Sequence, residues 1–414
     1  MDRDNIDAIS EALTELFGEL QNTIEQYAIY QLTQYTDTPE KWKSLQLKHQ
    51  KDFSKALDEL IKQFKIKINK PIEIAFNELY KDAKSEVKET REDVKESRET
   101  ESNRGLLILP INVNKKIKAF KKQVFGELDM LQKQSNIGFK SIVNNIGKTI
   151  IKGKITSGDI LYAQIEKAMQ KGIKDMFVTY KNGRRVSYKA YMEMNVRTTM
   201  HQEALAYQFE NARKMGVVFY LASSHGDCAD DHAKYQGKLY YDESWQSIAK
   251  ESEQKAIAEF ISRNKLMSIQ DVRDGKPYLG TRPNCRHKYK PLTLSQVLNN
   301  SVKELLVEHK LIKGKYDSEK YKNLQYQRLL ERKVRQAKQD RDNLEIEIKN
   351  AKDDVTKKKL QEKLANKKSL VHKNQRELNS LVKGNKYLER DYRRENYKTI
   401  VQDVGYKYRN AKSN

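Results

Sequence analysis

The stretch that decides the fold begins as Val217-Val218-Phe219-Tyr220-Leu221-Ala222 and continues as Ser223-Ser224-His225-Gly226-Asp227-Cys228-Ala229-Asp230-Asp231-His232. The first six residues are β-branched, aromatic or apolar, which is typical of a buried strand. The strand leads directly into a polar loop that carries a thiol, two imidazoles and three carboxylates. Because a rigid strand that ends in such a loop commonly presents functional groups, this stretch predicts a small α+β domain built around a site.

The same domain ends with a second motif, Pro283-Asn284-Cys285-Arg286-His287. Between them, the two motifs contain both cysteines of the chain and three of its seven histidines. Two thiolates and two imidazoles are the ligand set of a closed structural zinc site, and soft ligands of this kind exclude calcium and magnesium. The sequence therefore predicts zinc as a cofactor. The predicted ligands are Cys228, His232, Cys285 and His287, with His225 as a substitute for any one of them.

Two other interpretations of these residues stay open. In the first, the side chains form a buried hydrogen-bonded cluster without metal, in which Arg197 and Arg286 pair with the aspartates of the loop. In the second, Cys228 is a nucleophile with a neighbouring histidine as its base. The chain lacks H-E-x-x-H, G-x-S-x-G, a phosphate-binding loop and the zinc-deaminase signature, so no complete catalytic motif is present and we expect no enzyme.

Length and composition set wider limits. A chain of 414 residues predicts two or three domains, and 33% charged against 37% hydrophobic residues predicts elongated, thinly buried helices. Two cysteines cannot form a disulfide framework, which favours an intracellular, reducing assembly site over secretion. The N-terminus does not resemble a signal peptide, and no run approaches the 18 apolar residues of a membrane-spanning helix.

Periodicity predicts a mostly α fold with a small α+β domain. Apolar spacing of three and four residues predicts a first helix over 5–34, a long helix over 188–215 and a long C-terminal helical hairpin that turns near 350–356. Asn182-Gly183 between β-forming residues predicts a β-hairpin. The predicted domains are a helical N-terminal region (1–104), a helical connector (105–180), the α+β domain (181–295) and a basic helical tail (296–414).

The net charge of the chain is +23, and residues 301–414 hold 31 Lys/Arg against 17 Asp/Glu, a local charge of +14. Such asymmetry favours a polyanionic partner, and double-stranded DNA is the partner we expect. Solvated helix faces in a lysine-rich chain are the simpler explanation of the same charge. The predicted nucleic-acid contacts are Arg328, Arg332, Lys333, Arg335, Arg390, Arg393 and Arg394.

These motifs carry a resemblance. The run from Asn182 to Tyr191, the central motif that continues to Tyr235-Gln236-Gly237-Lys238, the closing motif and the basic tail occur in the order found in the phage minor capsid protein 2 family, relatives of the Mu F-like head-morphogenesis proteins. Many members have a cysteine where this chain has His232, which leaves the ligand type open. The resemblance implies a structural component of a tailed-phage or prophage head, located in the virion, that acts in head morphogenesis, contacts portal and capsid proteins and accompanies DNA. The rival hypotheses are a metal- or cysteine-dependent hydrolase in residues 188–292 and a DNA-binding accessory protein.

Overall fold

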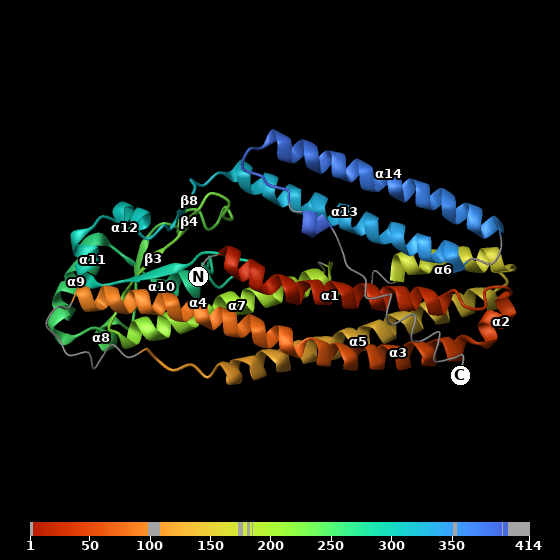
Figure 1. Ribbon diagram of the computed structural model, residues 1–414, viewed down its shortest axis with the longest axis horizontal. Helices are drawn as coiled ribbons and strands as arrows, with labels where there is room; N and C mark the ends of the chain where they lie inside the picture. The colour runs from red at the N-terminus through yellow and green to blue at the C-terminus, as the bar shows by residue number, and fades with distance from the viewer. Residues whose placement is uncertain are drawn as a thin grey trace. The chain divides into compact units, whose positions relative to one another are not determined.

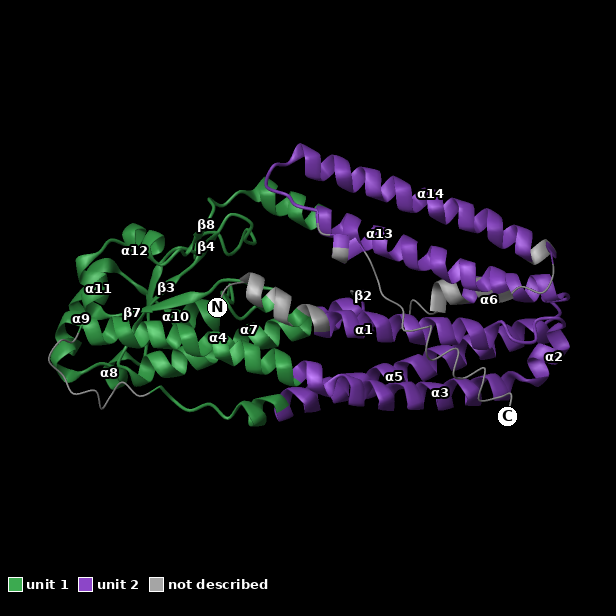
Figure 2. Cartoon of the chain, viewed as in Figure 1, with its two compact units in different colours: residues 1–11, 73–117, 194–326 green, residues 12–72, 118–193, 327–414 purple. Residues whose placement is uncertain are grey.

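The computed structural model describes residues 3–97, 108–172, 177–179, 183, 185–350, 354–390 and 392–395. Long helices dominate these residues, and the strands are short and few (Figure 1). The predicted fold class, mostly α with a small α+β region and C-terminal helices, is confirmed. The chain divides into two compact units, each assembled from three separate segments (Figure 2). Unit 1 comprises residues 1–11, 73–117 and 194–326, and unit 2 comprises residues 12–72, 118–193 and 327–414.

The long helices are α1 (Arg3–Leu32), α3 (Gln46–Lys67), α4 (Asn69–Glu96), α5 (Val113–Ile151), α7 (Tyr188–Lys214), α13 (Ser318–Asn350) and α14 (Asp354–Gly384). The shorter helices are α2 (Pro39–Ser44), α6 (Gly158–Gly172), α8 (Trp245–Ile248), α9 (Glu251–Asn264), α10 (Ile269–Arg273), α11 (Leu294–Asn299), α12 (Val302–Glu308) and the 3-10 helix η3 (Tyr392–Glu395). The predicted first helix, the predicted helix over 188–215 and the predicted C-terminal hairpin correspond to α1, α7 and the pair α13 and α14.

Unit 2 is helical and is held together by aromatic packing. The rings of Phe53 on α3 and Phe139 on α5 stack with centroids 4.0 Å apart, and Phe17 on α1 meets Phe64 on α3 at 5.7 Å. Such pairs add roughly 1 kcal/mol each to the burial of their area. A polar contact also joins α1 to α13, where the Gln339 side-chain amide donates to Glu25 over 2.6 Å.

Two short strands in unit 2, β1 (Phe177–Thr179) and β2 (Arg185–Ser187), pair antiparallel with Thr179 opposite Arg185. Their pairing agrees with the predicted hairpin. Asn182 itself lies outside the described residues, and Gly183 has a positive φ of 78°. A turn residue with positive φ suits glycine, which has no Cβ to clash. The predicted turn of the C-terminal hairpin falls between α13 and α14, where residues 351–353 also lie outside the described residues.

Unit 1 contains a four-stranded sheet in the order β6-β5-β3-β7. Its central strand β3 pairs antiparallel with both β5 and β7, while β5 and β6 are parallel. A separate parallel pair joins β4 to β8. The strands are β3 (Phe219–Ala222), β4 (Ser224–His225), β5 (Leu239–Tyr241), β6 (Met267–Ser268), β7 (Tyr289–Leu292) and β8 (Ile312–Lys313).

All four residues of β3 are buried, because both faces of the sheet are covered. On one face Phe219 packs edge-on against Phe260 of α9, with ring centroids 5.4 Å apart. On the other face Tyr220 packs against Phe209 of α7 at 4.4 Å. The fully buried side chains of β3 therefore form the centre of unit 1, and the loop that follows Ala222 starts from a rigid point.

The two units alternate along the chain, and one of their boundaries lies within a single helix. Helix α7, for example, gives residues up to Glu193 to unit 2 and residues from Met194 to unit 1. The four consecutive domains expected over 1–104, 105–180, 181–295 and 296–414 stay a prediction about chain organisation.

Candidate functional site

Two loops of unit 1 bring the predicted ligands toward the end of the sheet. The first follows β3 and contains a tight turn in which the His232 N–H donates to the Ala229 carbonyl over 2.9 Å. The second precedes β7, and there the Cys285 N–H donates to the Arg282 carbonyl over 2.9 Å. Asn284 has a φ of 62°, a left-handed conformation that asparagine tolerates better than most residues. This backbone turns the thiol of Cys285 toward His287.

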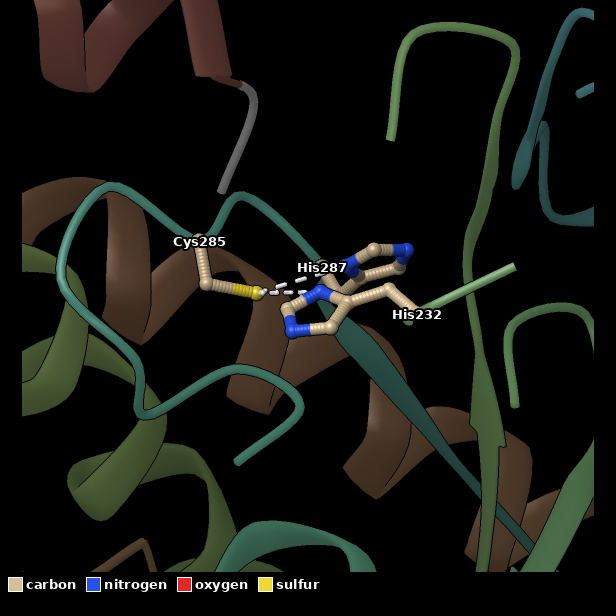
Figure 3. A group of neighbouring side chains, drawn as sticks. All are labelled: His232, Cys285 and His287. Carbon is tan, nitrogen blue, oxygen red and sulfur yellow. Dashed lines mark hydrogen bonds between the residues drawn. The ribbon is translucent and has the colours of Figure 1, made fainter. Parts of the chain in front are cut away.

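The three side chains of His232, Cys285 and His287 converge (Figure 3). The Sγ of Cys285 lies 3.3 Å from Nδ1 of His287 and 3.7 Å from Nδ1 of His232. One potential ligand atom from each residue lies within 4.8 Å of the other two. Both histidines are buried and the cysteine is half-buried. Three of the four predicted ligands therefore meet at one point.

The far ring nitrogens of the two histidines are held by carbonyl oxygens. Nε2 of His232 lies 3.1 Å from the carbonyl of Pro277, and Nε2 of His287 lies 3.1 Å from Oε1 of Gln236. The orientation of the Gln236 amide is itself determined, because its Oε1 accepts from the His225 N–H over 2.7 Å and its Nε2 donates to the His225 carbonyl over 3.1 Å. In both histidines Nε2 is therefore the protonated nitrogen and Nδ1 carries the lone pair.

Burial keeps these groups uncharged. It lowers the pKa of His287 well below its ordinary value, with the nearby His225 and His232 adding to the effect, and it lowers the pKa of His232. Burial also raises the pKa of the Cys285 thiol. A fourth histidine, His201 on α7, donates from Nε2 to the His287 carbonyl over 3.1 Å, and burial lowers its pKa to about 4.

The other predicted ligands lie outside the cluster. Among the described residues, the set whose ligand atoms meet within 4.8 Å contains neither Cys228 nor His225. Nε2 of His225 is engaged with the Ser223 hydroxyl at 2.8 Å. Cys228 is buried, and burial, followed by the charges of Asp227 and Cys285, raises its pKa to about 12. That shift is opposite to the lowered pKa of an activated cysteine nucleophile.

Two of the three aspartates of the loop, Asp230 and Asp231, contact residues other than Arg197 and Arg286. Asp231 accepts a 2.6 Å bond from Arg282, and Asp230 accepts one of 2.5 Å from the Tyr316 hydroxyl. Both pairs are exposed, so competition from water weakens them. The Arg282–Asp231 pair joins the two loops, and the Tyr316–Asp230 bond joins the first loop to the segment after β8. The buried contacts of the histidines determine the centre of the site.

The predicted nucleic-acid residues are divided among different environments. Arg332 and Lys333 are exposed, and Arg328 is half-buried. Arg335 is half-buried and donates to the carbonyl of Arg394 over 3.0 Å. Arg390 pairs with the buried Glu395 through two bonds of 2.5 and 2.7 Å. The guanidinium of Arg394 lies 4.0 Å from Glu331, and the side chain of Arg393 lies outside the described residues.

A different basic surface lies on α14, which runs alongside α13 (Figure 1). One stripe of α14 is buried: Leu360, Val371, Asn374 and Leu378. Seven Lys/Arg side chains on the rest of the helix are exposed: Lys357, Lys358, Lys359, Lys368, Lys373, Arg376 and Lys383. The exposed acidic side chains of α14 are Asp354 and Glu362. We call these seven residues the α14 basic face.

Comparison with known proteins assigns the chain to a class. The family model for phage minor capsid protein 2 matches residues 1–383, and the chain belongs to this family. It is therefore a phage minor capsid protein, and such a protein assembles with other phage structural proteins. Neither the curated proteins nor the solved structures contain a match. Within the described ranges, every helix is too short or too polar to cross a lipid bilayer.

Proposed function

We propose that this minor capsid protein is a structural component of the phage head that contacts the packaged DNA through the α14 basic face. In this proposal it assembles in the bacterial cytoplasm, acts in head morphogenesis next to the portal, and stays in the mature virion. The observation that supports DNA contact is the charge of α14, where seven exposed Lys/Arg side chains stand against two exposed carboxylates.

The dimensions of the α14 basic face suit a duplex. Lys357 and Lys383 are 26 residues apart, so at about 1.5 Å per residue the face is about 39 Å long. That length is close to one turn of B-form DNA, about 34–36 Å. Lysine and arginine on such a face contact phosphates, which carry no sequence information. A protein that lies against packaged DNA of any sequence needs this kind of contact.

The α14 basic face replaces Arg390, one of the predicted contacts, in this proposal for a physical reason. Arg390 is paired with a carboxylate that is fully buried, so a phosphate would have to displace Glu395 and leave it uncompensated. The side chains of Lys358, Lys373 and Arg376 are exposed on the side of α14 opposite Leu360. A phosphate contact at these three positions costs no buried ion pair.

A binding experiment on the full chain tests the proposal. Fluorescence anisotropy with a random-sequence duplex should give an affinity that falls steeply with salt, because each phosphate contact releases about 0.9 counterion. Replacing Lys358, Lys373 and Arg376 together by glutamine should weaken binding about 100-fold near 0.15 M salt and reduce the slope by about 3.

The matched control changes the same net charge at a different place. Lys51, Lys55 and Lys62 are exposed lysines of α3, and their replacement by glutamine should change the affinity less than 5-fold. Equal losses in the two triple variants would mean that net charge alone drives binding, and would count against the α14 basic face. The portal contact is tested by isolating the wild-type chain together with the proteins bound to it. Absence of the portal protein from these complexes would count against the portal contact.

A further inference from the structure

We propose that His232, Cys285 and His287 hold a single zinc ion in unit 1, with three protein ligands and a fourth position open to water rather than closed by Cys228. This site is independent of the proposed contact with DNA, since all of its residues belong to unit 1 and α14 belongs to unit 2. Four observations support it: the spacing of the ligand atoms, the tautomers of the two histidines, the donor to the sulfur and the position of Cys228.

The spacing fits a tetrahedral ion. Zinc lies about 2.3 Å from a thiolate sulfur and about 2.0 Å from an imidazole nitrogen. At a tetrahedral angle these lengths place sulfur and nitrogen about 3.5 Å apart. The two observed distances from Cys285 Sγ are 3.3 Å to His287 and 3.7 Å to His232. Both sulfur–nitrogen separations are therefore close to the one that the ion requires.

Hydrogen bonding within the cluster is incomplete without a cation. Both Nδ1 atoms carry lone pairs, because both Nε2 atoms donate their protons to carbonyl oxygens. The thiol of Cys285 has one proton and can satisfy only one of the two lone pairs. A thiolate would face both lone pairs with no donor between them. One divalent cation at this point accepts all three lone pairs at once.

The surroundings of the three ligands resemble those of metal sites. Ligating histidines almost always donate their second ring nitrogen to a carbonyl or carboxylate, which orients the ring, and Pro277 and Gln236 supply these acceptors. The Gly280 N–H points at Cys285 Sγ over 3.1 Å and would stabilise a thiolate. Gly280 has a φ of 85°, and a Cβ at this position would lie 2.9 Å from the ring of Tyr289, so only glycine suits the position.

One thiolate and two imidazoles select the metal. The thiolate disfavours calcium and magnesium, and the combination with imidazole is typical of zinc. The ion would join the loop after β3 to the loop before β7, so its binding free energy would add to the stability of unit 1. The open fourth position distinguishes this site from the four-ligand structural site that the residue types of the two motifs predict.

Zinc analysis of the full chain, purified under reducing conditions without chelator, tests the proposal. We expect about one zinc per chain in the wild type and in Cys228→Ser. In Cys285→Ser and His287→Gln, affinity should fall at least 100-fold, and zinc should be lost on dialysis. Less than 0.2 zinc per wild-type chain after dialysis against excess zinc would overturn the site and favour a metal-free cluster. Equal loss in Cys228→Ser and Cys285→Ser would overturn the three-ligand arrangement.

X-ray absorption at the zinc edge counts the sulfur ligands of the ion in the unmodified chain. This test does not depend on whether a variant folds. One sulfur neighbour at about 2.3 Å with two or three nitrogen or oxygen neighbours at about 2.0 Å is the expected result. Two sulfur neighbours would place Cys228 in the coordination sphere and overturn the open position.

Discussion

Replacing Gln236 by methionine should destabilise unit 1 far more than a single side-chain amide usually does. The side-chain amide of Gln236 bonds both backbone groups of His225, and its Oε1 also accepts from Nε2 of His287. In the parallel pair of β4 and β8, Ser224 and Gly226 donate to the carbonyls of Leu311 and Lys313. The N–H and carbonyl of His225 point away from β8 and bond to the Gln236 amide. Gln236 therefore supplies the hydrogen bonds that a second neighbouring strand would supply. Methionine has a similar length but offers none of these bonds.

The size of the stability loss in Gln236→Met follows from the polar groups that the substitution leaves without hydrogen-bond partners. The His225 N–H, the His225 carbonyl and the His287 ring nitrogen each lose a bond in a place where Gln236 itself is only 9% exposed. An unsatisfied buried group costs about 1–3 kcal/mol, so three groups cost about 4 kcal/mol when entry of water offsets part of the loss. The cost does not require a metal, so it should persist in the presence of a chelator.

The assay uses the two tryptophans of the chain, because one belongs to each unit. Trp42 is buried in unit 2, and Trp245 packs against the core of unit 1. In a Trp42→Phe background the fluorescence of Trp245 reports the unfolding of unit 1 alone. Urea unfolding of this background, with and without Gln236→Met, should give midpoints whose difference corresponds to about 4 kcal/mol at an unchanged slope.

The matched control is Gln254, whose amide donates a single exposed bond of 2.9 Å to the Gln246 carbonyl. Gln254→Met should change the stability by less than about 0.5 kcal/mol. A loss below about 1 kcal/mol for Gln236→Met, or equal losses in the two variants, would refute the argument that Gln236 completes the bonding of β4.

Two further predictions concern the carboxylates of Glu25 and Asp242. Burial raises the pKa of Glu25 to about 7, so its contribution to stability is fully present below pH 4.5 and is lost as the pH rises through 7. Urea unfolding should therefore show the wild type losing about 2–3 kcal/mol relative to Glu25→Gln between pH 5 and 8.5, and parallel pH profiles would contradict this. Asp242 is fully buried and accepts a 2.7 Å bond from Arg213. Asp242→Ala should destabilise unit 1 by about 3 kcal/mol in the Trp245 assay, and a loss under 1 kcal/mol would show that solvent already satisfies Arg213.

Local patterns predicted much of the fold. The helix expected over 188–215 is α7 (Tyr188–Lys214), and the strand expected at 217–222 is β3 (Phe219–Ala222). Both depend on contacts between residues close in the chain, which periodicity and cap residues report directly. The two units are not visible in the sequence, because each collects three separate segments, and residues 194–326 separate the last two segments of unit 2. Long-range packing of this kind leaves no mark on composition.

The sequence predicts only part of the candidate site, because the rest depends on contacts between residues far apart in the chain. Residue type alone indicated His232, Cys285 and His287, and the structure brings them together. The position of Cys228 depends on how the loop after β3 turns, which ligand spacing does not determine. Gln236 lies in a motif noted for its resemblance to the family, yet nothing in that motif indicates that its amide orients a ring 51 residues away.

The most direct test of the central claim, that this capsid protein lies against DNA through α14, is cross-linking in the assembled particle. Formaldehyde would be applied to DNA-filled heads of the encoding phage or prophage, followed by nuclease digestion and mass spectrometry of the nucleotide-bearing peptides. We predict that the chain is present in these heads and that its adducts concentrate on lysines of the α14 basic face, with few on Lys51, Lys55 or Lys62. Absence of the chain from filled heads, or adducts spread equally over α3 and α14, would contradict it.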